Sequence, residues 1–402
     1  MFLENTTSEK PMDIFFLLLC LMGLFAILSS TMSKNPVLPL FAESIGTPEY
    51  LMGIVAAAST IPGIIVSLPA GSLSDVLGRR KVLILSSIIF ASAPFLYLLV
   101  ALPWQLIAVR FYHGFATAIF VPVANAAIAE RFPRRRGEKI SIFSSVTVVG
   151  RGVAPFLGGY ILLATSSNYH DLYVSVGVAG VVALLVAVAL PKIESTKKEE
   201  QGFQKKTIES KGFLSNWKKV IQNRGVLVTS AVESATYYTF GAFEYFLALY
   251  AKSIGLDEFL IGVVIGLQLV MVAISKPFMG WVSDRIGRRI PIIIGLIISS
   301  APLIVTSLAT SFVELIAVSL TYGLGFSLVT SSTVALVSDL TGKQSYGASM
   351  GFLSTVMDVG QTTGPIITGF VLSSAGFTSA FVTLGGLLLV FSAFFSMTTK
   401  VK

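Results

Sequence analysis

Charge is scarce in this 402-residue chain: charged residues make up 12% of it, hydrophobic residues 54%, and the mean hydropathy is +0.81. A soluble domain usually carries about 25% charged residues, so most of this surface does not face water. Cysteine is nearly absent as well. A single residue, Cys20, excludes an intramolecular disulfide and a cluster of thiolate metal ligands.

Catalytic groups are equally sparse. The chain has two histidines and contains neither H-E-x-x-H nor G-x-S-x-G, so no catalytic set is evident. It has no Walker A sequence, and Gly323-Leu324-Gly325 lies within an apolar run rather than after a strand. We therefore expect no enzyme activity, no cofactor and no bound metal ion.

Long apolar runs are what the sequence does contain. A run of roughly 20 residues crosses a hydrocarbon core of ~30 Å. Twelve such runs occur, at 13–41, 49–70, 81–101, 104–129, 140–164, 171–190, 225–250, 258–279, 290–309, 312–336, 347–372 and 377–397. Asp13 stands where a cleavable signal would carry basic residues, so the first run is predicted to be a span. The expected fold is an all-α polytopic membrane protein with twelve transmembrane helices.

Basic residues are distributed unevenly among the predicted loops. With the N-terminus in the cytoplasm, Lys252 is the only basic residue in an outside loop. Lys34, Arg110, Arg151 and Lys276 lie in spans, and the others fall on the cytoplasmic side. This positive-inside bias predicts a multi-pass protein of the cell (plasma or inner) membrane with both termini cytoplasmic. The lipid bilayer, rather than nucleic acid, accounts for the net charge of +8.

An internal repeat divides the chain. The stretch 71–81 (GSLSDVLGRRK) returns 209 residues later at 280–290 (GWVSDRIGRRI), and 38–53 aligns on 247–262. Six spans separate equivalent positions, so the halves are predicted to be parallel repeats about an axis along the membrane normal. The predicted units are an N-terminal six-helix bundle (1–190), a polar cytoplasmic linker with a possible interfacial helix (191–224) and a C-terminal six-helix bundle (225–402).

The duplicated G-x-x-x-D-x-x-G-R-R loop, in a twelve-span chain, resembles the major facilitator superfamily over nearly its whole length. The resemblance implies two parallel-related six-helix bundles around a central cavity, and a monomer that moves a small-molecule substrate by alternating access. It also implies a cytoplasmic lock that holds the outward-facing state. Its residues would be Gly71, Asp75, Gly78, Arg79 and Arg80, and Gly280, Asp284, Arg285, Gly287, Arg288 and Arg289. Alternatively, these arginines only anchor spans to lipid phosphates. Val76 stands opposite Arg285, so unequal latches are expected.

Two further motifs match family patterns. Arg110-Phe111-Tyr112-His113-Gly114 resembles the R-x-x-x-G motif, whose arginine is tied to proton coupling; Ser319 stands there in the second half. A structural, snorkelling Arg110 and a neutral, packing His113 are the alternatives. A glycine-proline pattern resembles that of the antiporter branches, with Ala154 replacing the usual glycine, or serves close helix packing alone. Its residues are Gly150, Gly152, Pro155, Gly158 and Gly159, and Gly360, Gly364, Pro365 and Gly369.

Charged residues inside spans are the remaining candidates for function. Each costs roughly 3 kcal/mol in lipid, so they should face the cavity or one another. They are Lys34, Arg110, Arg151, Glu233, Glu244 and Asp358, with the cations in one half and the acids in the other. Glu244 is favoured because the stretch 244–250 looks like span 7 of drug-proton antiporters. The alternative is an ion pair with Lys34 that only joins the halves. Lys276 is expected to snorkel at the cytoplasmic end of its span.

Aromatic residues could line such a cavity or simply pack: Tyr112, Tyr237, Tyr238, Phe240 and Phe243. Burial raises the pKa of a carboxyl group in general and a nearby cation lowers it, which allows protons and a cationic substrate to compete. We therefore expect a secondary transporter that exports small amphipathic or drug-like compounds, with protons as the coupling ion. The alternatives are uptake or exchange of an anionic small metabolite held by Lys34, Arg110 and Arg151, and, more distantly, a membrane sensor without transport.

Overall fold

The computed structural model describes residues 13–66, 74, 77–191, 220, 222–341 and 346–398, and this part of the chain is helical with short turns. Gly71, Asp75, Val76 and the predicted linker helix lie outside the described residues. The first half comprises α1 (Ile14–Met32), α2 (Val37–Ser44), α3 (Glu49–Ala57, continuing as a span to Val66), α5 (Arg79–Tyr97), α6 (Pro103–Arg131), α7 (Arg136–Ala164) and α8 (Tyr169–Ala189).

The second half repeats this order. It comprises α10 (Arg224–Ser253), α11 (Glu258–Ile286), α12 (Arg289–Val305), a 3₁₀ turn (Thr306–Leu308), α13 (Phe312–Leu340) and α14 (Tyr346–Thr398). Its 53 residues would make α14 about 80 Å long, far more than a bilayer needs. Gly376, with φ of 75° and ψ of 177°, breaks it into two limbs, 346–375 and 377–398. A positive φ of this kind is readily adopted only by glycine.

Polar side chains begin several of these helices. The Asp13 carboxylate accepts a hydrogen bond from the Phe15 amide at the start of α1, and Asn223 does the same for Gly225 and Val226 of α10. Ser311 and Glu314 form a capping box at the start of α13. Such caps satisfy amide groups that have no partner within the helix, so they set where each span begins.

The described helices confirm the predicted spans. Ten of them have the length and composition to cross a membrane. One of those ten is α14, which consists of two helices and therefore counts as two spans. The 30-residue helix α10 adds one more span, although its polar side chains make it less apolar than the other ten. Together they make the twelve spans of an all-α polytopic membrane protein.

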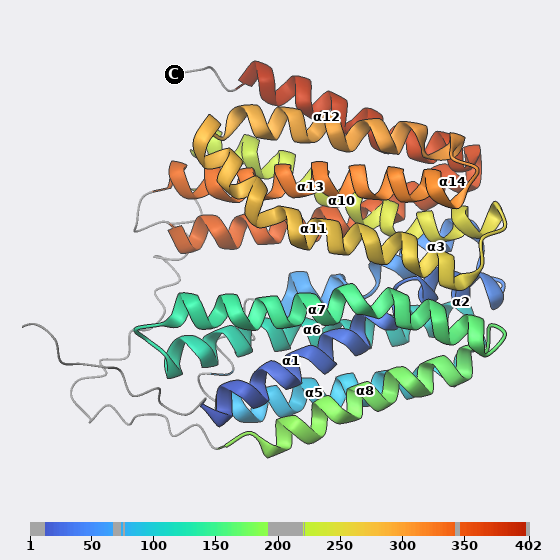
Figure 1. Ribbon diagram of the computed structural model, residues 1–402, viewed down its shortest axis with the longest axis vertical. Coiled ribbons are helices and arrows are strands. Elements are labelled where there is room, and N and C mark those ends of the chain that lie inside the picture. The colour runs from blue at the N-terminus through green and yellow to red at the C-terminus, as the bar shows by residue number, and fades with distance from the viewer. Residues whose placement is uncertain are drawn as a thin grey trace, which may run out of the picture.

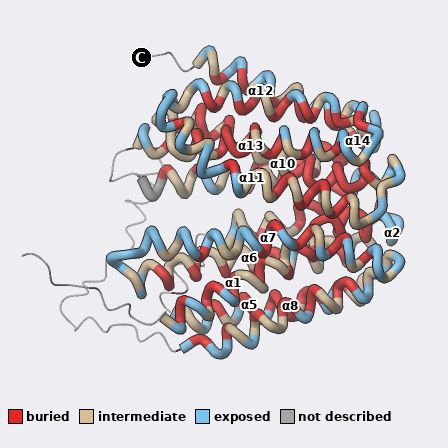
Figure 2. The backbone as a smooth tube through the Cα atoms, in the orientation of Figure 1, coloured by how far each residue is buried: buried red, intermediate tan, exposed pale blue. Residues whose placement is uncertain are grey.

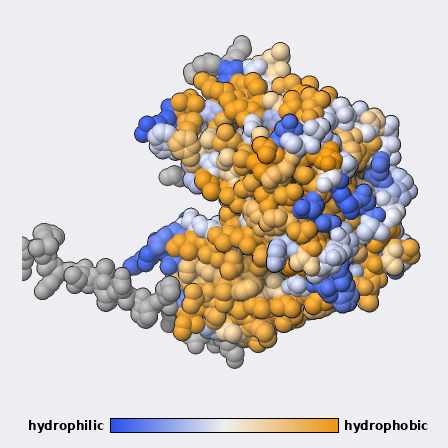
Figure 3. Space-filling model, turned by 45° about the vertical axis from the view of Figure 1, so that its right-hand side comes forward, coloured by the Kyte–Doolittle hydropathy of each residue, from blue (hydrophilic) through white to orange (hydrophobic). Residues whose placement is uncertain are grey.

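The helices form two groups that lie side by side, α1–α8 in one and α10–α14 in the other (Figure 1). The described chain begins and ends on one side of the molecule, at the left of Figure 1, and there the groups diverge. The space-filling view shows a deep cleft between them, open to that side (Figure 3). At the opposite side α2, α3, α10 and α14 meet, and many of their residues there are buried (Figure 2). The predicted arrangement around a central cavity is thus present, and the cavity is open on the side predicted to be cytoplasmic.

Glycine and proline residues allow the two groups to meet at the closed side. A Cβ atom on Gly53 of α3 would overlap the carbonyl oxygen of Pro365 in α14, and one on Gly262 of α11 would overlap that of Pro155 in α7. The two glycines are 209 residues apart, so the repeat relates the two contacts. We call these contacts the crossing points. Only glycine permits so close an approach of two backbones.

Some of the other predicted packing glycines also lie at contacts between the two halves, and the rest lie at contacts within one half. Gly159 and Gly369 lie against backbone of α11 and α3, one turn beyond each proline. Gly152 contacts a side chain of α11. The rest pack within their own half: Gly150 and Gly158 against α1 and the turn that follows it, Gly360 and Gly364 against α10.

The crossing points can be tested by overpacking. Gly53→Leu should force the two groups of helices apart at the closed side. Overpacking of a tight contact costs about 1–3 kcal/mol. This cost should raise the population of the conformation that is open at that side roughly tenfold. Spin labels on Ser44→Cys and Ser253→Cys, which lie exposed at that side, would report the separation in a Cys20→Ser background. Gly386→Leu is the matched control, because a Cβ there meets no atom within 4 Å. Equal distance distributions in the two variants would contradict the role of the crossing points.

Candidate functional site

One face of α10 carries two buried acids. Glu233, Tyr237, Phe240 and Glu244 follow the spacing i, i+4, i+7 and i+11, which places them in one stripe along a helix. We call it the α10 stripe. Glu233 and Glu244 have 0% and 3% of their surface exposed. A rise of 1.5 Å per residue separates them by about 16 Å along the axis. The stripe thus spans from the closed side of the molecule into its middle.

Glu244 lies at the closed side and is fully paired. Lys34, in the turn between α1 and α2, places its Nζ 2.8 Å from Glu244 Oε2, and the Asn35 amide donates to Oε1 at 2.7 Å. The ion pair with Lys34, one of the two interpretations left open by the sequence, is therefore present. Because Lys34 and Asn35 belong to one half and Glu244 to the other, these contacts tie the halves together.

The repeat explains why these residues meet. Asn35 and Glu244 are 209 residues apart, so they occupy equivalent positions in the two halves. Glu43 and Lys252 are related in the same way and form an exposed ion pair of 3.2 Å nearer the surface. Equivalent residues of two parallel repeats touch where they approach the axis that relates them. Asn35, which the sequence analysis missed, could have been found from this offset.

Arg110 is buried within the N-terminal half. It donates hydrogen bonds to the hydroxyls of Ser59 and Tyr97, and Tyr97 in turn lies 3.4 Å from Nδ1 of His113. A Cβ on Gly114 would overlap the Ser59 backbone, where the helical path of α3 is interrupted. Among the described residues Arg110 has no ionic partner. The R-x-x-x-G motif thus holds a buried cation against the break after α3.

Four charged side chains form a second group between the halves. Lys276 of α11 lies within electrostatic reach of Glu233 and of Arg151 of α7, and Tyr237 lies within reach of Glu233, Arg151 and Asp358 of α14. Because Arg151 belongs to one half and the others to the second, the group lies between the halves. We call it the cleft cluster. Lys276, expected only to snorkel, adds a cation to the wall that the sequence predicted to be acidic.

The cleft cluster is poorly paired. Within the part of the chain that the structure describes, the side chains of Arg151, Lys276 and Asp358 form no hydrogen bond and no ion pair. Glu233 accepts one hydrogen bond, from the hydroxyl of Thr333, and its Oε1 has no described partner. Thr333 was not foreseen, since a threonine in an apolar run carries no distinguishing pattern. Arg151 and Lys276 are exposed, and charged side chains that face an open cavity at membrane depth mark a functional site.

Aromatic side chains continue the α10 stripe. The rings of Phe240 and Phe326 stack with centroids 4.4 Å apart, and Tyr237 lies 5.2 Å from Phe326. Tyr237 and Phe240 are half-buried, whereas Phe243 is fully buried against Tyr322 and Phe381. Tyr112 shares a hydrogen bond with Ser92 at 2.9 Å. Of the five predicted aromatic residues, only Tyr237 and Phe240 lie in the stripe with both acids.

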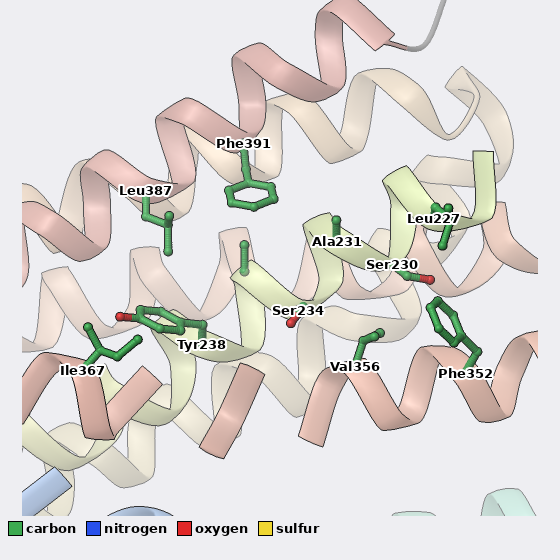
Figure 4. A pocket seen from close by; sticks show the side chains of 11 residues that line it. Leu227, Ser230, Ala231, Ser234, Tyr238, Phe352, Val356, Ile367, Leu387 and Phe391 are labelled. Carbon is green, nitrogen blue, oxygen red and sulfur yellow. The ribbon is translucent and has the colours of Figure 1, made fainter. Parts of the chain in front are cut away.

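Tyr238 lines a different cavity, on another face of α10. This space of about 590 Å³ lies between α10 and the two limbs of α14 (Figure 4). Its lining is almost wholly apolar and comprises Leu227, Ser230, Ala231, Ser234, Ala235, Tyr238, Phe352, Val356, Ile367, Leu387 and Phe391. At 100° per residue these positions of α10 centre about 120° from the stripe. The apolar cavity is therefore separate from the charged cleft.

The described contacts of Arg79, Arg80, Arg288 and Arg289 in the repeated loops lie within their own half. Arg79 contacts Glu130 at 3.3 Å, and Arg288 contacts Asp284 and, at 2.9 Å, Asp339. Glu130 and Asp339 are again 209 residues apart. Arg80 donates to the carbonyls of Val188 and Leu190, and Arg289 to that of Ser396. These loops lie at the open side of the cleft, so the predicted lock between the halves is not engaged in the described part of the structure.

Glycine forms the turn in both loops, and a cation stacks beside one of them. Gly78 and Gly287 have φ of 91° and 83°, so both turns use a conformation that favours glycine. Arg285 lies over the ring of Trp281 at 4.0 Å, a cation–π contact that the first copy cannot make because Ser72 and Val76 stand there. The two copies thus differ in sequence at this contact, and their action as unequal latches stays a prediction.

A family model described as the Major Facilitator Superfamily matches residues 19–267 and 231–402 of the chain. A protein named as a transporter of that type from Methanocaldococcus jannaschii is 26% identical over 366 residues, 90% of each chain. A homolog of the multi-drug resistance efflux pump PmrA from Lactococcus lactis is 24% identical over 371 residues, 90% of this chain and 89% of its own. The multidrug resistance protein MdtG of Escherichia coli is 27% identical over 375 residues, 90% and 88% of the two chains.

Solved structures show the same fold. The nucleoside transporter NupG matches with a TM-score of 0.78 at 14% identity, over 96% of this chain and 100% of its own. A bacterial homolog of the human lysosomal transporter Spinster, in an inward-facing and unoccupied conformation, matches with a TM-score of 0.78 at 16% identity, over 97% and 96% of the two chains. At such identities the likeness concerns the arrangement of helices alone.

The pairing of Glu244 leads to a test of the closed side. Removing one partner of a buried ion pair costs about 3–5 kcal/mol. The side chain of Lys34 is 22% exposed, so water offsets part of this cost. We therefore expect Glu244→Gln to favour opening of this side roughly tenfold. Met52, buried at the same interface beside Tyr245, provides the probe. A membrane-impermeant thiol reagent should modify Met52→Cys faster when Glu244 is replaced.

Lys252→Gln is the matched control, because its ion pair with Glu43 is exposed on both sides. Exposed pairs contribute about 0–1 kcal/mol, so the modification rate should change little. An equal acceleration in both variants, or none in Glu244→Gln, would show that the buried pair does not hold the halves together.

Proposed function

Since the chain belongs to the major facilitator superfamily and is a membrane transporter rather than an enzyme, we propose that it exports small amphipathic compounds in exchange for protons. The observation that carries this proposal is the cleft cluster. It holds acids that can bind either protons or a cationic compound, next to the half-buried rings of Tyr237 and Phe240, in a cleft open to the side predicted to be cytoplasmic. The similarity to the PmrA homolog and to MdtG, which match over most of their length and are named for multidrug resistance, supports export of drug-like compounds.

The arrangement suggests how alternating access would proceed. A compound enters the cleft from the cytoplasmic side and contacts the cleft cluster and the aromatic part of the α10 stripe. Opening of the outer side then requires the crossing points to separate and Glu244 to release Lys34 and Asn35. The repeated loops close the cytoplasmic side at the same time, which is the lock that the family resemblance implies. We therefore propose Glu244 as a gate residue of a monomeric transporter in the cell membrane, with both termini cytoplasmic.

A second candidate is uptake or exchange of an anionic metabolite. It is favoured by one observation: neither Arg151 nor Lys276 has an ionic partner among the described residues, so both are available to a carboxylate or phosphate. Lys34, assigned to this task from the sequence, is already paired with Glu244. The cations of the cleft cluster therefore replace it in this alternative.

The direction of proton exchange separates the two candidates. In weakly buffered detergent solution, adding the lipophilic cation tetraphenylphosphonium to the purified protein should release protons, because a cation in the cleft favours ionised carboxyl groups. The pH of the solution reports the release directly. In vesicles, a pH gradient should then drive movement of this cation. Absence of proton release at every pH, together with absence of flux, would overturn proton-coupled export of cations.

Arg151→Gln with Lys276→Gln tests the alternative. Binding of a cationic compound should survive this double replacement, because it removes only positive charge from the cleft. Binding of an anion such as benzoate, measured by calorimetry, should be lost if the metabolite interpretation is correct. A protein that binds benzoate before the replacement and not after it would favour uptake or exchange of an anion over export.

A further inference from the structure

We propose that the proton is bound by Glu233, hydrogen-bonded to Thr333 and charge-balanced by Lys276, and that its counter-substrate is an amphipathic cation. This deepens the proposed function and rests on it for the coupling, though the proton site can be tested without any substrate. Glu233 is fully buried between α10 and α13, and its Oε2 accepts a hydrogen bond from the Thr333 hydroxyl. Its Oε1 has no described partner. A buried carboxylate needs its charge to be paired and hydrogen-bonded, and a single hydrogen bond leaves this one suited to bind a proton.

The hydroxyl of Thr333 suits both protonation states of its neighbour. It has a single hydrogen but three oxygens within reach, those of Glu233, of the Val329 carbonyl at 2.9 Å and of the Thr330 carbonyl at 3.3 Å. When Glu233 is ionised, Thr333 donates to it. When Glu233 is protonated, the acid donates to Thr333 Oγ1, and the hydroxyl turns its hydrogen to the Val329 carbonyl. A proton can thus arrive or leave without moving the backbone.

The charges that face this site come from three other helices. Lys276 of α11 lies near Glu233 without forming an ion pair with it, and Arg151 of α7 lies near Lys276. Tyr237, on the same helix as Glu233, interacts with it and with Asp358 of α14. With Glu233 ionised the two acids balance the two cations. With Glu233 protonated the cleft holds one excess positive charge.

This balance determines the sign of the coupling. A cation that enters the cleft is repelled by the excess charge and therefore binds better when Glu233 is ionised. Linkage is reciprocal, so the bound cation must also weaken proton binding by the same factor. Proton and cationic compound then exchange for one another, as antiport requires. An anion would have the opposite effect and would be carried together with the proton.

Glu244 does not fit this part of the cycle. Both of its oxygens are engaged, by Lys34 and Asn35, and it lies about 16 Å along the stripe from Glu233. The two acids of one helix would thus divide the work, with Glu233 binding the proton and Glu244 closing the outer side. A rigid helix is a direct physical connection between them.

Infrared difference spectroscopy tests the proton site without a substrate. Between alkaline and mildly acidic solution, above the range in which exposed carboxyl groups take up protons, the full-length protein in lipid nanodiscs should gain the carbonyl stretch of a protonated carboxyl, and Glu233→Gln should lose this band. Thr333→Val should move the band to higher frequency, because the protonated acid loses its hydrogen-bond partner. Thr330→Val is the matched control: it lies one turn away on the same helix, is equally buried, and should leave the band unchanged. A band that persists in Glu233→Gln and is unaffected by Thr333→Val would overturn the assignment.

Proton release on adding tetraphenylphosphonium tests the coupling. Glu233→Gln should still bind this cation but release no protons, whereas the unmodified protein releases them. If both proteins release protons equally, the assignment of Glu233 fails and the proposed exchange stands. If the infrared band titrates as expected but tetraphenylphosphonium neither releases protons nor moves across vesicles, the proton site stands and export of amphipathic cations fails. Proton uptake on cation binding would overturn the coupling sign.

Discussion

A charge inside a membrane must find a partner or water, and this constraint organises the centre of the molecule. Each of the predicted intramembrane charges meets it differently. Lys34 and Glu244 neutralise one another between the halves, and Arg110 is held by the hydroxyls of Ser59 and Tyr97. The cleft cluster satisfies the constraint only in part, with acids and cations that balance in number but do not pair. Its incomplete pairing is what leaves it open to a proton or a charged compound.

Equivalent contacts of the two repeats hold the halves together, whereas the charged contacts between the halves come from positions at which the repeats differ. Gly53 with Pro365 and Gly262 with Pro155 are equivalent contacts that bring the two halves together on one side. Where strict symmetry would place identical residues opposite each other, the chain has Asn35 against Glu244 and Glu43 against Lys252. Identical acids would repel one another at the axis. Because the two halves differ at these positions, the residues that meet at the axis attract one another, and their contacts can be broken.

The α10 stripe joins this contact to the cleft. Glu244 at one end belongs to the closed side, and Glu233 at the other end belongs to the cleft cluster, with Tyr237 and Phe240 between them. A change of charge at either acid acts on the same rigid element. This offers a physical link between what occupies the cleft and which side is open, since each state of a transporter is stabilised by contacts that the other state lacks.

The sequence by itself determined the spans and the relation of the halves, because length, apolar composition and a repeat offset are local or periodic properties, and it predicted the orientation of the spans from the distribution of basic residues. It also identified which charges had to be accounted for, since charge in an apolar run is costly wherever the run lies. It left open whether Glu244 pairs with Lys34, and it did not single out Thr333 or the interaction of Lys276 with Glu233. Those contacts depend on how each helix is rotated about its axis and on which side of the molecule is closed. Both are set by packing between different helices, 43 to 210 residues apart in the contacts named here, and only the tertiary structure decided them.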